Sequence, residues 1–386
     1  MDSARVARIE HGRLDGLRPR RAGSNARLGE HGSRIRLPLV RITTDNGARG
    51  FGACWANRDE AAALVGRRID ELIGVERGVS ETGRRFEYPL WDLLGQLTGR
   101  PVYTLAEAIT DASARTDALA IASKPRRAPC YDTSLYFDDL SLNSIGEAAA
   151  LIASEACEGF ERGHRAFKIK VGRGARHLPQ EEGVQRDIAI VRAVREAVGP
   201  ASVLMLDANN GYNLNLTRRV LSETADCGVF WMEEPFHEDP VLYRDLKEWM
   251  AAAGMAVLIA DGEGEASRWL IDWARAGLID VIQYDISGHG FTRWLETGRE
   301  LDAYGVRSAP HHYGGLFGNY AACHLSGAIQ HFAFVEWDEA AAPGLDGSAY
   351  QIVEGKVILP DEPGFGLRLD ENRFRNAVAD GGYDVR

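Results

Sequence analysis

Single charged side chains follow a series of apolar stretches in the second part of this 386-residue chain. Residues 166–171, Ala-Phe-Lys-Ile-Lys-Val, alternate apolar and charged, which predicts a β-strand with Lys168 and Lys170 on one face. Two ammonium groups directed into an interior need carboxylates beside them, because an unpaired buried charge is costly. Charged and imidazole groups do follow the later apolar runs: Asp207, Glu233, Glu263, Asp285, His311 and Glu336.

The spacing of these residues predicts the fold that positions them. Their intervals run from 22 residues (263 to 285) to 30 residues (233 to 263), enough for one strand, one helix and two loops. We count eight apolar strands between Cys130 and Trp337, mostly separated by helical stretches, and no GxGxxG motif. No strand has the character of a sheet edge, which favours a closed parallel barrel over an open sheet. Barrel enzymes carry their chemistry at the carboxyl ends of the strands, where these groups lie.

Three carboxylates on consecutive strand ends predict a metal site. Taken alone, an aspartate after a strand is more often the N-cap of the next helix, and Glu233 could begin a helix. Together, Asp207, Glu233 and Glu263 would repel one another at the barrel mouth unless a cation lay between them. Oxygen ligands without histidine or cysteine favour Mg²⁺ or Mn²⁺ over zinc. We therefore expect these three side chains to be metal ligands.

The remaining charged groups suit proton transfer beside such a metal. Lys170 is predicted to act as an amine base, its pKa lowered by Lys168 and the cation. Asp285 and His311 suit a carboxylate–imidazole pair that acts as acid or base, although His311 alone could be a hydrogen-bonded core histidine. A substrate carboxylate on the metal would have an acidified α-proton, and the resulting enediolate would be held by the metal, Lys168 and a protonated Glu336.

Composition limits the partners and the compartment. The formal net charge of −11 argues against nucleic acid or an anionic membrane as the main partner. Local lysines and a metal can still attract a small anionic substrate into a cleft. Five scattered cysteines without CxxC spacing argue against disulfides and favour the cytoplasm. No run approaches 18 apolar residues and the N-terminus has no apolar leader, so we expect neither a membrane segment nor a signal peptide.

We expect three segments: a small α+β capping domain over residues 1–125, the barrel over 126–342, and a C-terminal segment over 343–386 that returns to the cap. In the cap, Asp45-Asn46-Gly47 predicts a hairpin, and helices are expected over 60–73 and 86–98. Residues 13–34, rich in arginine and glycine, predict a mobile basic loop, either plainly solvated or a lid over an anion. Residues 123–129 are expected to be a linker.

Several short motifs occur in one order along the chain: Phe167-Lys-Ile-Lys-Val-Gly, Leu206-Asp-Ala-Asn-Asn-Gly, Trp231-Met-Glu-Glu-Pro, Ala260-Asp-Gly-Glu, Gln283-Tyr-Asp, Ala309-Pro-His and Val335-Glu-Trp. Together they resemble the enolase superfamily, in particular its mandelate racemase/muconate lactonizing branch and the acid-sugar dehydratases within it. The resemblance implies an α/β fold, a modified (β/α)₇β TIM-type barrel under an N-terminal α+β cap. It also implies Mg²⁺, abstraction of a proton α to a carboxylate, and a homo-oligomer.

Matching the motifs also selects between neighbours. Asp261-Gly-Glu263 contains two carboxylates, and the Gly-Glu pair of the racemase branch selects Glu263, with Asp261 in reserve. Pro310-His-His contains two imidazoles, and the dehydratase Pro-His pattern selects His311 over His312. His289, in Ser-Gly-His-Gly, stands where the family often has a Gly-Gly loop, so it could alter the pocket.

The leading hypothesis is a Mg²⁺-dependent dehydratase (a hydro-lyase) of a sugar acid, an aldonate or aldarate, that loses the α-proton and the 3-hydroxyl. The alternative is a racemase or epimerase of a 2-hydroxy acid with Lys170 and His311 as bases on opposite faces. A barrel without activity, recruited for binding, is the third. We expect Asn209, His312 and Trp55 to contact the substrate, and the cap loops 13–34 and 53–58 to roof the pocket.

Overall fold

The computed structural model describes residues 4–110, 126–264, 266–313 and 315–386. At the centre of the described chain, parallel strands follow one another in both sequence and sheet order. These strands are β6 (Arg127–Leu135), β7 (Ala166–Lys170), β8 (Val203–Asp207), β9 (Val229–Glu233), β10 (Leu258–Asp261), β11 (Val281–Ile282), β12 (Arg307–Ser308) and β13 (Val335–Trp337).

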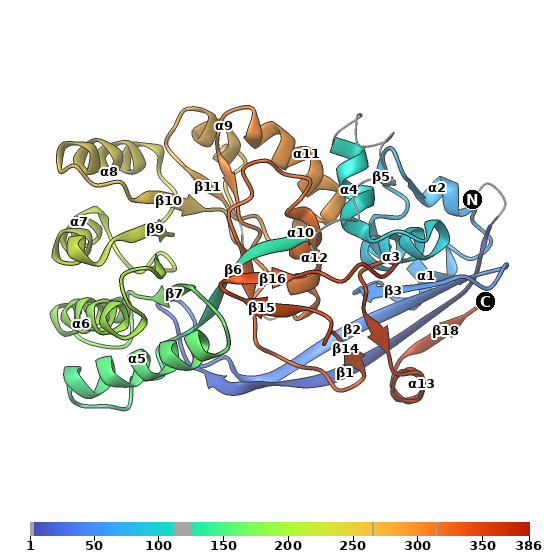
Figure 1. The fold of residues 1–386 in the computed structure, drawn as a ribbon, viewed down its shortest axis with the longest axis horizontal. Helices are drawn as coiled ribbons and strands as arrows, with labels where there is room; N and C mark the ends of the chain where they lie inside the picture. The colour runs from blue at the N-terminus through green and yellow to red at the C-terminus, as the bar shows by residue number, and fades with distance from the viewer. Residues whose placement is uncertain (1–3, 111–125, 265, 314) are drawn as a thin grey trace.

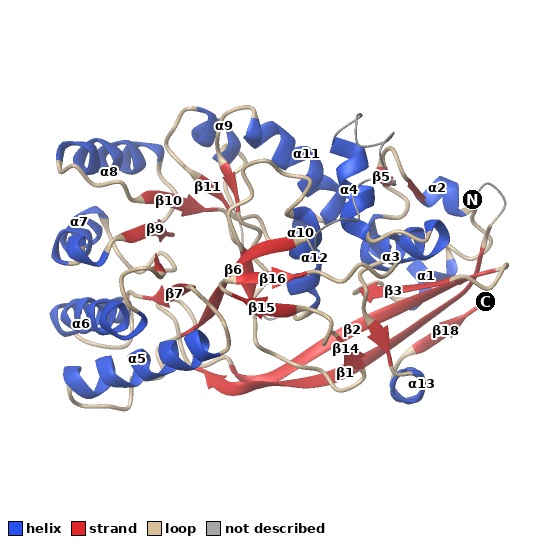
Figure 2. Ribbon diagram, viewed as in Figure 1, coloured by secondary structure: helices blue, strands red, loops and turns tan. Residues whose placement is uncertain are grey.

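The sheet closes on itself. β13 pairs with β6 in parallel, and a parallel bridge joins Ser308 at the end of β12 to Phe332 just before β13. Figure 2 shows the strands inside and the connecting helices outside. These helices are α5 (Ile145–Glu161), α6 (Gln180–Val198), α7 (Leu214–Glu223), α8 (Pro240–Ala252), α9 (Leu270–Arg275), α10 (Ile286–His289), α11 (Phe291–Asp302) and α12 (Phe317–Leu325). The predicted α/β barrel is confirmed.

The interior of the barrel has an apolar layer below its charged mouth. Tyr131, Met205, Trp231 and Ala260 are fully buried and pack as one cluster apart from the main core. Side chains along a strand alternate in direction, so residues two positions apart point the same way. Asp207 and Glu233 therefore point into the barrel two residues after Met205 and Trp231, at the carboxyl ends of the same strands. The apolar layer excludes water from beneath the charges and lowers the local dielectric constant.

The cap is an antiparallel sheet that carries helices on both of its faces (Figure 1). Its strands, in the order β18-β1-β2-β3, are β1 (Val6–Ala22), β2 (Gly32–Thr44), β3 (Arg49–Ala53) and β18 (Tyr383–Val385). Its helices are α1 (Arg58–Ala62), α2 (Ile69–Leu72), α3 (Glu87–Thr98), α4 (Val102–Thr110) and α13 (Glu371–Ala379), and a small pair is formed by β4 (Ile73–Gly74) and β5 (Gly78–Val79). The predicted helix over 86–98 is confirmed. The helix predicted over 60–73 is wrong, because Gly66, at φ +80°, lies between α1 and α2.

The prediction of a mobile loop over residues 13–34 is wrong. Most of this segment belongs to β1 and β2, which pair from Arg13–Pro38 to Leu17–Arg34. Arginines alternate here with buried residues such as Leu14 and Ile35, a period-two pattern that the high charge obscured. Only residues 23–31 form the turn, and the hairpin reaches from the cap to the barrel (Figure 1), where Ser24 bridges to Phe137.

The C-terminal segment touches both parts of the molecule. Two short strands, β15 (Gln351–Val353) and β16 (Lys356–Ile358), pair with each other, and β16 also pairs with β6 of the barrel. β14 (Leu345–Asp346) pairs with β17 (Arg368–Leu369), and β18 returns to β1 of the cap. Residues 123–125 of the predicted linker, with the boundary at residue 125, lie outside the described residues. Residues 127–129 belong to β6, so the prediction of a linker is wrong there. No helix within the described ranges has the length and apolarity needed to cross a membrane.

Candidate metal centre and active site

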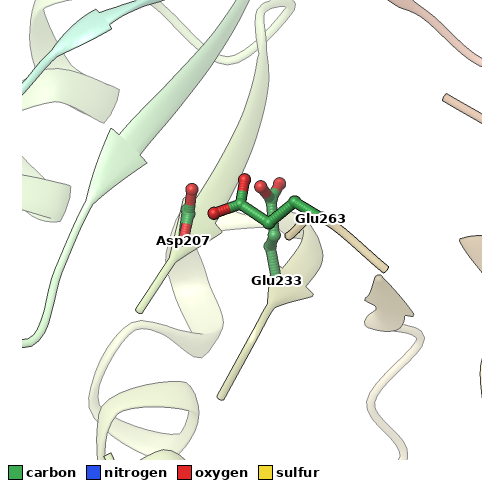
Figure 3. A group of neighbouring side chains, drawn as sticks. All are labelled: Asp207, Glu233 and Glu263. Atoms are coloured by element: carbon green, nitrogen blue, oxygen red, sulfur yellow. The ribbon is translucent and has the colours of Figure 1, made fainter. Parts of the chain in front are cut away.

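Asp207, Glu233 and Glu263 converge at the mouth of the barrel (Figure 3). One oxygen from each carboxylate lies within 4.8 Å of the others, and all three residues are buried. Asp207 and Glu233 are the last residues of β8 and β9, and Glu263 follows β10. Gly262 adopts φ +122°, which residues with a Cβ rarely tolerate, and this turn carries Glu263 inward. Asp261 instead accepts hydrogen bonds from the Tyr243 hydroxyl and the Gly262 amide, so the choice of Glu263 is supported.

Neighbouring amides orient the three carboxylates. The Asn209 side-chain amide donates to Glu263 Oε1 at 3.0 Å, and its backbone N–H donates to Asp207 Oδ1 at 2.9 Å. Gln283 Nε2 donates to Glu233 Oε2 at 2.9 Å, and Trp231 Nε1 donates to the same oxygen at 3.1 Å. Asn209 holds this position with a left-handed φ of 42°. Through its side chain and its backbone, Asn209 therefore supports two of the three candidate metal ligands.

The donor set fits Mg²⁺. All three candidate ligands are carboxylates, and the buried Oε2 of Glu263 has no hydrogen-bond partner among the described residues. Burial, followed by the charge of Asp207, raises the pKa of Glu233 to about 8 against the opposing effect of Lys168. A divalent cation bound to these oxygens would remove that repulsion, and hard oxygen ligands suit Mg²⁺.

The two lysines of β7 are buried against these carboxylates. Lys168 Nζ lies 2.8 Å from Glu233 Oε1 and 3.1 Å from Glu336 Oε1. Lys170 Nζ contacts Asp207 and lies 5.3 Å from the centre of the Tyr136 ring. Burial lowers the pKa of Lys170, but the carboxylates of Asp207, Glu263 and Glu233 together outweigh it, so the pKa is raised. The prediction of a lowered pKa is not met in this arrangement, and a cation on Asp207 would weaken the opposing effect.

His311 and Asp285 form the predicted pair. His311 Nδ1 lies 3.1 Å from Asp285 Oδ2, and a parallel bridge joins the backbones of the two residues. His311 Nε2 lies 3.3 Å from Glu263 Oε2. Burial lowers the pKa of His311, but Glu263, Glu336 and Asp285 together raise it to about 9. The imidazole is thus held in a fixed orientation and in its protonated form at neutral pH.

Glu336 is ionised, which corrects the prediction that it acts as a protonated donor. Its oxygens accept hydrogen bonds from Thr133 Oγ1 at 2.6 Å and from the His312 amide at 2.9 Å. Burial raises the pKa of Glu336, but Lys168 and His311 outweigh it and hold the pKa well below its usual range. The His312 imidazole bonds to the Glu336 carbonyl and is buried, so His312 positions Glu336.

A cavity of about 530 Å³ leads from this cluster to the cap. Lys170, Glu263 and His311 line its inner end. Its other lining residues come from the hairpin and from three barrel loops: Arg18, Asn25, Arg27, Leu28, His31, Arg34, Ile35, Arg36, Tyr136, Gly264 and Tyr313. The hairpin, predicted as a lid, therefore contributes to the pocket as a built strand pair with a short turn.

The predicted substrate contact Trp55 lies outside the cavity, and several residues that line the cavity were not predicted individually from the sequence. Trp55 is 58% exposed in the segment after β3, and no residue of 53–58 lines the cavity within the described chain. Tyr313 directly follows the Pro-His-His motif, so its place beside His311 could have been inferred. Arg18 and His31 carried no such signal, because they lay in the segment mistaken for a mobile loop.

Comparison with known proteins agrees with this geometry. The family described as Enolase C-terminal domain-like matches residues 151–373. The chain belongs to the mandelate racemase/muconate lactonizing family of the enolase superfamily. The predicted family is therefore confirmed.

Two crystal structures from Geobacillus share 46% identity with this chain. One is galacturonate dehydratase from Geobacillus sp., complexed with D-galacturonate and 5-keto-4-deoxy-D-galacturonate, with a TM-score of 0.93 and 100% coverage of both chains. The other is a mandelate racemase/muconate lactonizing protein from Geobacillus sp. Y412MC10, complexed with magnesium/tartrate, with a TM-score of 0.94 and coverage of 100% and 98%. D-galactarolactone cycloisomerase of Agrobacterium fabrum is 26% identical over 375 residues, 86% of this chain and 89% of that one.

Proposed function

We propose that this chain is a Mg²⁺-dependent dehydratase of a sugar acid. The observation that carries the proposal is the buried carboxylate triad with an amine and an imidazole on its two flanks. Lys170 lies on β7 and His311 follows β12, while the three ligands belong to β8, β9 and the end of β10 between them. The predicted enzyme class, a hydro-lyase of acid sugars, and the Mg²⁺ cofactor are confirmed by the relatives of known structure.

Each residue has a role in the elimination. When bound, Mg²⁺ supplies positive charge that makes the proton α to a substrate carboxylate more acidic. Lys170 removes that proton, and the C–H electron pair forms a double bond as the hydroxyl on the next carbon leaves. The His311 imidazolium, held by Asp285, gives its Nε2 proton to the departing hydroxyl, so water is released. Lys168 supplies a second positive charge beside the carboxylate oxygens, and Glu336 holds Lys168 in place.

The finer proposal concerns the substrate. The Geobacillus enzyme with D-galacturonate and its 5-keto-4-deoxy product is 46% identical over the whole chain. That product has lost a hydroxyl next to the carbon that carries the proton α to the carboxylate, which is the elimination described above. We therefore take a hexuronate such as D-galacturonate as the first candidate, a sugar acid of a different class from the predicted aldonate or aldarate.

A screen of the purified chain against acid sugars with Mg²⁺ tests the proposal. D-galacturonate, aldonates and aldarates should be compared, with mass spectrometry for the loss of one water. We expect a deoxy-keto acid from at least one of them, and no product after chelation of the metal. A product of unchanged mass with inverted configuration would instead establish the racemase or epimerase. No conversion of any sugar acid would overturn the proposal.

The oligomeric state and the cellular location of the chain are two further proposals. We propose a homo-oligomer, on the resemblance to the family, which sedimentation of the purified chain would test. A cytoplasmic location remains a prediction, in keeping with five cysteines that all have free thiols in the structure.

A further inference from the structure

Two aromatic side chains at the outer part of the cavity have polar atoms without partners. His31 lies at the end of the hairpin turn in the cap, and Tyr313 follows the His311 loop of the barrel. Both line the cavity, and their ring centres are 5.3 Å apart. His31 Nε2 and the Tyr313 hydroxyl are buried, and neither has a hydrogen-bond partner among the described residues. Leaving such a buried group without a hydrogen bond is costly, so a ligand that supplies the bond is favoured.

The Tyr313 ring is held from several sides. The Arg18 guanidinium lies 4.5 Å from its centre and is itself fixed by Asp338, at 3.0 and 2.8 Å from Nε and Nη2. The Tyr136 ring lies 4.9 Å away on another side. The Tyr136 hydroxyl influences the pKa of Tyr313 but does not form a hydrogen bond of good geometry with it. The packing around the ring fixes the position of the hydroxyl oxygen. A binding group held in place in this way is preorganised for its ligand.

His31 is suited to a neutral polar ligand. Burial, together with the charges of Lys170 and Arg18, lowers the pKa of His31. At neutral pH its imidazole is therefore uncharged and offers one donor and one acceptor nitrogen. A sugar hydroxyl, which both donates and accepts, is the complementary group.

We propose that His31 and Tyr313 form a subsite that binds the hydroxyl groups of the sugar acid beyond the reacting carbons. This inference rests on the proposed function, and it names how the length of the substrate is recognised. The acid end lies at the carboxylate triad, and the chain of the substrate extends along the cavity to the cap. On this proposal we expect a six-carbon acid to reach both residues and a four-carbon acid to end before them. Because one residue belongs to the cap and the other to the barrel, a long substrate joins the two domains.

The test compares a long acid with a short one on the Mg²⁺-loaded full chain. D-galacturonate is the long probe, and tartrate, measured as a competitive inhibitor, is the short one. Tyr313→Phe removes only the hydroxyl, and His31→Asn removes the position of Nε2. We expect each variant to raise KM for D-galacturonate roughly threefold to tenfold, with a smaller change in kcat and unchanged inhibition by tartrate. His31→Gln, which keeps a polar atom near Nε2, should recover part of the loss.

Tyr304→Phe is the matched control, because Tyr304 is 56% exposed and lies outside the cavity. Equal losses for both acids, or unchanged KM for D-galacturonate in both variants, would overturn the subsite while leaving the dehydratase intact. A wild-type chain without activity on any sugar acid would overturn the proposed function, and the subsite with it. Melting curves of each variant show whether a loss is merely one of folding.

Discussion

Two buried clusters of charge lie side by side at the carboxyl ends of the barrel strands, and they are built differently. The arginine cluster consists of Asp139, Arg173, Arg186 and Asp187. The metal cluster consists of Lys168, Lys170, Asp207, Glu233 and Glu263. A hydrogen bond of 3.1 Å from Arg173 Nη1 to the backbone oxygen of Lys170 connects them. The residues of both clusters are buried. The clusters differ in how their charges are paired and which hydrogen bonds they form.

The arginine cluster is neutral within itself. Arg173 bonds to Asp139 through Nε and Nη2 and to Asp187 through Nη1 at 2.7 Å. The Gly172 amide and the Tyr212 hydroxyl fill further positions on Asp187. Two carboxylates thus meet two guanidinium groups, and only Arg186 Nε lacks a partner among the described residues. Such a cluster orders the strand end without a ligand.

The metal cluster is incomplete without a ligand. Its three carboxylates each place an oxygen within 4.8 Å of the others, and oxygens of Glu263, Asn209 and Gln283 have no hydrogen-bond partner among the described residues. A buried cluster whose charges and hydrogen bonds are satisfied within the chain serves to stabilise the fold. Crowded carboxylates beside a cavity, with oxygens that lack hydrogen bonds, indicate instead a site that a cation and a substrate complete.

The largest effect is expected from removing a metal ligand. Glu233→Gln or Asp207→Asn should abolish Mg²⁺ binding and reduce kcat by roughly 10³-fold or more, because the charge that acidifies the α-proton is lost. Calorimetric titration with Mg²⁺ and steady-state kinetics measure this. The fold should persist, since removing one carboxylate also relieves repulsion. Unchanged Mg²⁺ affinity in both variants would contradict the assignment.

The next effect concerns the proton carriers of the metal cluster. Lys170→Ala and His311→Asn should each reduce turnover by about 10²- to 10⁴-fold while Mg²⁺ affinity changes little. In deuterated solvent, His311→Asn should still exchange the substrate α-proton if Lys170 alone removes it. His312→Asn is the control for the neighbouring imidazole. Full activity of His311→Asn with loss in His312→Asn would show that the second histidine is the acid.

Breaking the arginine cluster should lower stability but leave Mg²⁺ binding nearly unchanged, the reverse of the effect of removing a metal ligand. Asp139→Asn leaves Arg173 with one carboxylate and should lower the free energy of unfolding by about 3 kcal/mol, because a buried charge loses its partner. The Mg²⁺ affinity of the folded protein should be nearly unchanged. Urea denaturation and metal titration of the same variant separate the two. Loss of Mg²⁺ affinity without loss of stability would make the division between the clusters wrong.

The smallest effect on stability is expected from a buried carboxyl that forms no ion pair among the described residues. Asp92, in α3, accepts hydrogen bonds from the amides of Phe51 and Phe365, and burial raises its pKa to about 7. A raised pKa in the folded state means that its contribution to stability is full below about pH 4 and is lost as pH rises to 7. The slope is at most about 1.4 kcal/mol per pH unit.

Asp92→Asn removes this titration, so the stability of the wild type relative to the variant should fall between pH 4 and 7. Chemical denaturation at several pH values measures the difference. A difference that does not change with pH would contradict this prediction. It would show that Asp92 stays ionised over this range, because its hydrogen bonds favour the ionised form more than burial disfavours it.

The strand-end groups could be predicted because their spacing is tied to local structure. Lys168 and Lys170 alternate in a strand, and Asp207 and Glu233 end apolar runs, so neighbouring residues alone indicate where they point. Period, apolar runs and motif order therefore determined the barrel, the metal ligands and the family. The high charge of residues 13–34 misled because arginine is common both in solvated loops and on the exposed face of a strand.

What only the tertiary structure decided are the contacts between distant segments. The turn at Gly262 turns Glu263 inward, and His311 is the imidazole that meets Asp285. Arg18 pairs with Asp338, 320 residues away along the chain, and this pair supports the ring of Tyr313. Local sequence carries no record of such pairings, because they depend on how the cap hairpin crosses the barrel mouth. The sequence by itself thus determined which chemistry the chain carries, and the packing of cap on barrel decided the shape of the cavity in which it occurs.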